Sequence, residues 1–188
     1  MKLILAGKNH TDLRLGGRSH GSLYRGGELL WQRAAQRWLP WEQPRLTAND
    51  SYGGLAASSI NTVSNAQPYL LSDGIKEGTA TSWEAMQHIA PAWVTWTLPV
   101  TLRIRSITLY NKYSSTNNVT KNVRVYADEA ETVLIGEGVF AGSAFSAITI
   151  APAQPVQTNV LRIRCVDSYV NYVGIGEIEI DADYLEVS

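Results

Sequence analysis

The side chains that most often carry enzyme chemistry are few in this chain, and they do not form a recognisable catalytic pattern. The three histidines, His10, His20 and His88, lack the HExxH spacing of a metalloprotease, and no GxSxG element marks a nucleophile elbow. Gly174 and Gly176 lack the third glycine of a dinucleotide-binding loop, and no GxxxxGK[ST] phosphate loop occurs. We therefore expect a protein that is not an enzyme.

The remaining reactive side chains also have simpler explanations. Glu177 and Glu179 lie on the same face of one predicted strand, where acids are common, whereas general acid catalysis needs carboxyls in opposed, unlike environments. The single cysteine, Cys165, cannot form an internal disulfide or a thiolate zinc cluster, so we expect it to be buried in a strand.

Composition narrows the class of protein further. The chain has 188 residues, of which 45% are hydrophobic and 18% charged, a balance that predicts a globular protein with one main core. A net charge of −1 gives no general reason to bind nucleic acid or an anionic membrane. No apolar run approaches the roughly 20 residues of a membrane span, and Leu3 to Ala6 is too short for a secretory signal. We expect neither membrane insertion nor Sec export.

The first part of the chain differs in charge from the rest. Residues 1–41 hold seven lysines or arginines against two acids, a balance of +5, whereas the remainder holds nine against fifteen, a balance of −6. Gly16-Gly17 and Gly26-Gly27 separate short runs that suit strands, and a two-residue Gly-Gly link favours a hairpin. We predict an N-terminal segment over residues 1–42 and a main domain over residues 43–188, with the boundary at 42–46.

Three tryptophans, Trp31, Trp38 and Trp41, lie within eleven residues of one another. They carry more apolar area than so small a segment can bury by itself, so they are expected to pack on the main domain or on another chain. This makes the segment a predicted assembly element of a homo-oligomer. The helical spacing of some of its apolar residues leaves both helix and strand open for residues 29–39.

From about residue 44 onward the apolar residues alternate with a period of two. Such runs recur every ten to twenty residues and are separated by clusters of Gly, Pro, Asn, Ser and Asp. No long helical stripe interrupts them. The pattern predicts an all-β fold, an antiparallel β-sandwich or jelly roll with functional loops gathered at its ends. Within it, Val94, Trp96 and Leu98 are expected to point inward.

A set of short motifs, in order and with suitable spacing, makes the chain resemble a known family. The motifs are Leu46-Thr47-Ala48, Leu71-Ser72-Asp73-Gly74, Thr81-Ser82-Trp83, the strand from Trp93 to Leu98, those from Ile107 to Lys112 and from Asn122 to Ala127, and the closing strand from Val173 to Ile180. Over about residues 44–182 they resemble the discoidin family, or coagulation-factor type C domains, and within it the family 32 carbohydrate-binding modules of the galactose-binding-like fold.

The resemblance implies a structural calcium ion beneath the Asp-Gly turn, held by Asp73, Thr81 and Glu177. Calcium takes six to eight hard oxygen ligands, which a tight loop and a neighbouring strand can supply. The loop here is about three residues longer than is usual in the family, and Ile75 stands where a second acid is frequent. Glu77 or backbone carbonyls could compensate. In the alternative interpretation, Asp73 caps a turn and Glu177 only hydrogen-bonds the loop.

The resemblance also implies a sugar site in the loops at one end of the sandwich. An aromatic ring would stack on the sugar ring while amide and basic groups bond its hydroxyls. The candidate residues are Tyr52, Lys112, Asn117, Tyr169, Asn171 and Tyr172. Alternatively, these loops are ordinary polar loops or contact another subunit. Trp83, Trp93 and Trp96 are assigned to the core and the sandwich edge.

A second, shorter resemblance concerns the N-terminal segment. The stretch from Leu23 to Trp31, together with Leu15-Gly16-Gly17, looks like segments of bacteriophage tail and tail-fibre proteins. We therefore expect a phage or prophage tail protein that attaches to host surface saccharide, contacts other tail proteins and is made in the host cytoplasm without a signal peptide. The main alternative is a structural tail protein with protein contacts only. A bacterial glycan-binding module and a lipid-binding relative are weaker alternatives.

Overall fold

The computed structural model describes residues 13–15, 18–20, 22–25, 28–32, 36–46, 54–60, 66–77, 82–86, 90–112 and 119–187. Nearly all regular structure in these ranges is β-strand, and the helical element among them is the short 3-10 helix η2 (Pro68–Ser72). The all-β prediction is confirmed. Within the same ranges, no helix has the length and apolar character needed to span a membrane.

The chain forms two compact units, residues 1–38 with 186–188, and residues 39–185. The first unit contains two antiparallel hairpins, β1 (Leu13–Leu15) with β2 (Arg18–His20), and β3 (Ser22–Arg25) with β4 (Glu28–Gln32). In the sequence, Gly16-Gly17 separates β1 from β2 and Gly26-Gly27 separates β3 from β4.

Residues 29–39, for which the sequence left both helix and strand open, form β structure where they are described. β4 ends at Gln32, and β5 (Gln36–Pro40) pairs with β13 (Gly174–Val187). Trp41 follows β5 and packs against the core of the second unit, with its ring edge-on to Trp96 at a centroid distance of 6.4 Å. The prediction that these tryptophans need a packing surface is confirmed for Trp41.

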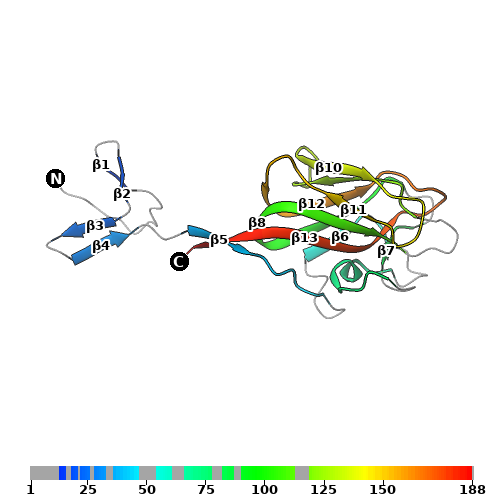
Figure 1. Ribbon diagram of the computed structural model, residues 1–188, viewed down its shortest axis with the longest axis horizontal. Coiled ribbons are helices and arrows are strands. Elements are labelled where there is room, and N and C mark those ends of the chain that lie inside the picture. Colours follow the sequence, from blue (N-terminus) through cyan, green and yellow to red (C-terminus); the bar gives the residue numbers. More distant parts are fainter. Residues whose placement is uncertain are drawn as a thin grey trace. The chain divides into compact units, whose positions relative to one another are not determined.

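The second unit is a sandwich whose two layers share one long strand, β8 (Ala92–Asn111) (Figure 1). The first part of β8 pairs with β6 and β12, whereas its last part pairs with β11 and β13, so the strand passes from one layer to the other. The remaining strands are β6 (Leu55–Ala57), β7 (Trp83–Glu84), β9 (Asn122–Tyr126), β10 (Leu134–Val139), β11 (Ala147–Ile150) and β12 (Val156–Cys165).

The core lies between the layers and follows the predicted alternation. Val94, Trp96 and Leu98 are all buried, as expected. Trp83 is also fully buried, whereas Trp93 lies at the surface of its layer with the Arg162 guanidinium 4.1 Å from its ring centroid. Burying one such large side chain stabilises the folded state by about 1.5–3 kcal/mol. Burial of the alternating apolar side chains is therefore a main source of the stability of the fold.

Cys165 is buried at the end of β12, as predicted. Burial raises the pKa of its thiol to about 12, so the side chain stays neutral. The residue is therefore a core side chain and not a nucleophile.

Candidate binding site at one end of the sandwich

Antiparallel pairing brings several loops to the same end of the sandwich. Asn111 at the end of β8 pairs with Ile175 at the start of β13, and Cys165 at the end of β12 pairs with Val123 at the start of β9. The described ends of the β8–β9 and β12–β13 loops therefore lie together, whereas the loop with Tyr52, also expected at this end, lies outside the described residues. We call this region the loop end.

Backbone contacts hold these two loops against each other. Thr120 and Ser168 form an isolated β-bridge, and the Tyr169 N–H donates to the Val119 carbonyl at 3.1 Å. The Asp167 carboxylate accepts hydrogen bonds from both the backbone N–H and the side-chain amide of Asn122, each at 2.9 Å. These contacts fix the base of the β12–β13 loop on the start of β9.

A buried polar cluster, the loop clamp, lies beneath the loop end and consists of Asn111, Thr120 and Gly174. The Asn111 side chain accepts hydrogen bonds from the backbone N–H groups of Lys112 and Thr120, both at 3.1 Å, and donates to the Thr120 carbonyl at 2.8 Å. The Thr120 hydroxyl bonds the carbonyl and the N–H of Gly174 at 2.7 and 2.8 Å. Since Asn111 and Thr120 are fully buried, the hydrogen bonds by which the clamp joins both loops are shielded from solvent.

Tyr169 is the most exposed of the described candidate sugar-binding residues, with 42% of its surface accessible. Its hydroxyl donates to the Phe140 carbonyl at 2.8 Å, and the Lys121 ammonium lies 5.8 Å from its ring centroid. The ring is therefore anchored at its tip and still accessible.

Lys112, a candidate for hydrogen bonds to sugar hydroxyls, is almost entirely buried. Its side chain is only 3% exposed, its ammonium forms an ion pair with Glu84 on β7, and the same nitrogen lies 5.4 Å from the Tyr172 ring centroid. The physical reason is that β7 pairs with the start of β13 and brings a carboxylate over the end of β8. The amine is thus turned inward toward Glu84 and Tyr172.

The other candidates have mixed outcomes. Asn171 and Tyr172 are partly exposed at the loop end, close in sequence to Tyr169. Tyr52 and Asn117 lie outside the described residues, so their roles stay predictions. Glu84 and Thr120 were not predicted, because nothing in their local sequence spacing marks them and only strand pairing brings them to the site.

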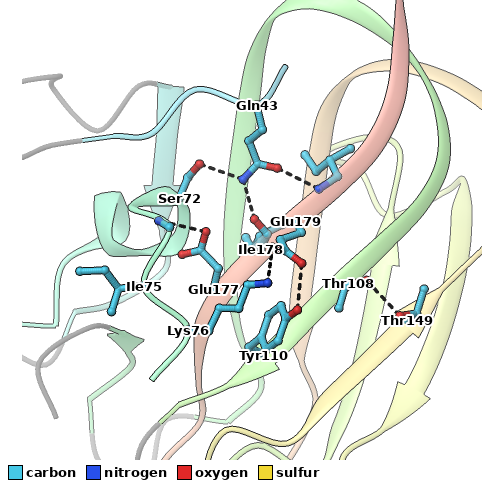
Figure 2. A network of polar contacts seen from close by, with 12 residues as sticks. Gln43, Ser72, Ile75, Lys76, Thr108, Tyr110, Thr149, Glu177, Ile178 and Glu179 are labelled. Atoms are coloured by element: carbon cyan, nitrogen blue, oxygen red, sulfur yellow. Dashed lines mark hydrogen bonds and ion pairs between the residues drawn. The ribbon is translucent and has the colours of Figure 1, made fainter. Parts of the chain in front are cut away.

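The predicted metal site lies beside β13, on the face of this strand that carries Glu177, Glu179 and Asp181, which we call the flank of the sandwich. The Gly74 N–H donates to Glu177 Oε1 at 3.3 Å (Figure 2). The Ile75 N–H donates to Asp73 Oδ1 at 2.8 Å. Glu177 is 2% exposed, and its Oε2 atom has no hydrogen-bond partner in the described part of the chain. Burial, and then the negative charge of Asp73, raise the pKa of Glu177 to about 8.

A cleft of about 510 Å³ adjoins this carboxyl pair. Gln43 spans one wall, where its amide donates to the Ser72 hydroxyl at 2.9 Å and the Ile178 carbonyl at 2.6 Å and accepts from the Ile180 N–H at 2.8 Å (Figure 2). On the same flank, Glu179 binds Lys76 at 2.6 Å and the Tyr110 hydroxyl at 2.9 Å. Burial works against ionisation of Glu179, but these two bonds hold its pKa below the ordinary value.

The chemistry of the carboxyl pair suits a hard cation. Two adjacent carboxyls provide oxygen ligands of the kind calcium takes, and one of them has a buried oxygen with no hydrogen-bond partner among the described residues. Among the described residues, no three His, Cys, Asp or Glu side chains gather around one point, and Thr81 lies outside these residues. In the alternative interpretation, Asp73 caps a turn and Glu177 only hydrogen-bonds the loop. The two hydrogen bonds that this interpretation requires are also present.

No family model and no curated protein matches the chain. Solved structures do resemble it. The family 32 carbohydrate-binding module of NanJ from C. perfringens, in complex with galactose, has a TM-score of 0.57 at 16% identity and covers 75% of this chain and 98% of its own. A second Clostridium perfringens module of that family, in complex with GalNAc-β-1,3-galactose, has a TM-score of 0.56 at 15% identity, with coverage of 71% and 96%. An F5/8 type C domain from Bacteroides fragilis has a TM-score of 0.56 at 16% identity, with coverage of 78% and 96%.

The chain has the fold of these domains. The β-sandwich of the second unit is therefore a galactose-binding-like fold, as the motifs predicted. The two Clostridium perfringens neighbours are carbohydrate-binding modules by name, and each was solved with a bound sugar.

Proposed function

We propose that this protein is a non-catalytic glycan-binding module whose loop end binds a saccharide. The observation that carries the proposal is that the loop clamp and a β-bridge join the two loops that bear the candidates Lys112, Tyr169, Asn171 and Tyr172, and that the Lys112 ammonium lies 5.4 Å from the Tyr172 ring centroid. The sugar complexes of solved structures with the same fold support it.

The chemistry of the loop end suits a neutral, amphiphilic ligand. Tyrosine rings offer flat apolar surfaces for the C–H faces of a sugar, and the Asn171 amide can both donate to and accept from hydroxyls. Because the loops are already joined by buried hydrogen bonds, little ordering remains to oppose binding. A shallow site of this kind binds a single sugar weakly.

Calcium is the proposed structural ion of the module. Asp73, Thr81 and Glu177 would hold it together with loop carbonyls, and the ion would neutralise two adjacent carboxyls. The buried Oε2 atom of Glu177, which has no hydrogen-bond partner in the part of the chain that the structure describes, supports this assignment. By joining the Asp73 loop to β13, the ion would stabilise the flank of the sandwich.

We further propose that the module belongs to a phage or prophage tail and attaches the particle to saccharide on the host surface. This step rests on the N-terminal sequence resemblance and its Gly-Gly hairpins. The proposed location is therefore the virion, after synthesis in the host cytoplasm, with copies of the chain and other tail proteins as partners. Repetition of the module would strengthen its weak sugar binding.

A glycan array, run on the full-length chain with and without a calcium chelator, tests the function. We expect the parent to bind a restricted set of saccharides and Tyr172→Ala to bind them about tenfold or more weakly. Arg105→Ala is the control, because Arg105 pairs with Asp181 on the flank, and it should bind as the parent does. If the parent protein binds no saccharide, the protein-contact role of a structural tail protein replaces this proposal.

A further inference from the structure

The ion pair between Lys112 and Glu84 is unusual because it is nearly excluded from water. The lysine side chain is 3% exposed and that of Glu84 14%. Removing two charges from water is costly, and a buried ion pair often stabilises a fold no more than apolar residues of similar volume would. A structural role alone is therefore a weak explanation for placing this pair below the loop end.

Three elements bring the pair to Tyr172. Lys112 follows the last residue of β8, Glu84 ends β7, and Tyr172 lies two residues before β13. Pairing of Glu84 with Gly174 brings β7 beside the start of β13. The Lys112 ammonium thus pairs with the Glu84 carboxylate and lies over the Tyr172 ring, 5.4 Å from the ring centroid.

Neighbouring residues leave the lysine little freedom. Asn111 fixes the Lys112 backbone by accepting its N–H at 3.1 Å. At Gly174, a Cβ atom would lie 2.8 Å from Lys112 Cδ and 2.3 Å from the Trp83 carbonyl oxygen, so only glycine leaves room for the lysine stem. The position of the ammonium is therefore set by the backbone and by packing.

We propose that Lys112 is a positioning residue, whose ammonium, held by Glu84, covers one face of the Tyr172 ring and fixes the ring so that a saccharide stacks on the opposite face. A cation over an aromatic ring is attracted to its electron-rich face, and the attraction grows when the pair is shielded from water. The proposal rests on the proposed function, and it changes the role of Lys112 from direct sugar contact to support of Tyr172.

A double-mutant cycle on the full-length chain distinguishes support from direct contact. We expect Lys112→Met to weaken saccharide binding about tenfold, the loss that corresponds to an attraction of this size. In a Tyr172→Ala background, the same change should cause no further loss. An additional tenfold loss in that background would overturn the proposal, because Lys112 would then contact the sugar itself.

Lys112→Met alone removes the cation that pairs with the nearly buried Glu84 carboxylate and can prevent folding. The variant Lys112→Met/Glu84→Gln removes both charges, and it should fold and show the same dependence on Tyr172. Lys76→Met is the matched control, since Lys76 also pairs with a glutamate and lies 4.9 Å from a tyrosine ring centroid, but is 44% exposed on the flank. We expect Lys76→Met to bind saccharide as the parent does. Equal losses of saccharide binding in Lys112→Met and Lys76→Met would contradict a specific role for Lys112.

An NMR measurement tests the contact without any sugar. The ε-methylene protons of Lys112 should show an upfield ring-current shift in the parent, which persists in Tyr172→Phe and disappears in Tyr172→Ala. Absence of that shift in a parent that does bind saccharide overturns the positioning role alone. If the shift is present but the parent binds no saccharide, the proposed function fails and the positioning role fails with it.

Discussion

The buried carboxyl of Glu177 makes the stability of the fold depend on pH. Its pKa is raised to about 8 by burial and then by Asp73, whereas the same carboxyl titrates near 4.5 in an unfolded chain. Between these values the folded state binds a proton that the unfolded state has lost. The stability from this group is therefore complete below about pH 4.5 and is lost as the pH rises through 8.

We predict that the metal-free protein melts at a lower temperature at pH 8.5 than at pH 5.5. The shifted pKa corresponds to at most about 5 kcal/mol, and Glu177→Gln, which is neutral at every pH, should show a clearly flatter dependence. Carboxyls with lowered pKa values, such as Asp183, lose their stabilising effect only in more acidic solution. Thermal melts in chelator check this, and parallel curves for parent and variant would refute it.

Calcium should reverse that destabilisation at neutral pH. An ion that binds only the folded state stabilises by mass action, by about 2.7 kcal/mol at a hundredfold excess over the Kd, or roughly 5–10 °C in a chain of this length. We expect this rise in melting temperature in the parent and little of it in Glu177→Gln or Asp73→Asn. Magnesium, which needs tighter octahedral geometry, is the control. Equal melting temperatures with calcium and with chelator would exclude the site.

At the scale of elements, the strands could be predicted because their signals are local. Alternation at period two placed Val94, Trp96 and Leu98 in the core, and the Gly-Gly pairs placed two hairpins in the first unit. The ordered motifs then sufficed for the fold. Helix or strand could not be decided for residues 29–39, because tryptophans at helical spacing compete with pairing partners far away in sequence.

The candidate site was less predictable, since its contacts join distant parts of the chain. A lysine that follows a strand is normally exposed, and only the pairing of β7 with β13 shows that Glu84 draws Lys112 inward. The loop clamp depends on Thr120 meeting Gly174, which sequence spacing does not indicate. The ligand roles of Tyr52, Thr81 and Asn117 stay predictions, because these residues lie outside the described ranges.

The loop clamp leads to a prediction for the two loops together. Asn111→Ala removes three hydrogen bonds and leaves buried backbone groups of Lys112 and Thr120 unpaired, which costs about 1–3 kcal/mol for each group left unsatisfied. We expect a lower melting temperature, faster amide exchange at Thr120 and weaker saccharide binding. Asn122→Ala is a control that loses side-chain bonds to Asp167 but keeps its backbone bond. If Asn111→Ala binds saccharide like the parent, the clamp does not organise the site.

For the whole molecule, the proposed tail function depends on the number of modules that bind at once. A single shallow sugar site is weak, whereas linked copies raise the effective concentration and can increase retention by about 10²–10⁴-fold. The basic, tryptophan-rich residues 1–42 are the predicted source of this linkage, because their apolar rings need a partner surface.

We therefore predict that light scattering of the full-length protein shows an oligomer. That oligomer should bind host envelopes, or a surface with dense saccharide, at least about a hundredfold more tightly than it binds the same free sugar. The same sugar in solution should compete only at concentrations near its own weak Kd. Tyr172→Ala should reduce the affinity for the surface by a larger factor than the affinity for the free sugar. The reason is that surface attachment needs several copies to bind at once, so the loss at each site is multiplied. A monomer in light scattering, with equal affinity for free and surface-bound sugar, would show that residues 1–42 are not an assembly element and that attachment does not operate through avidity.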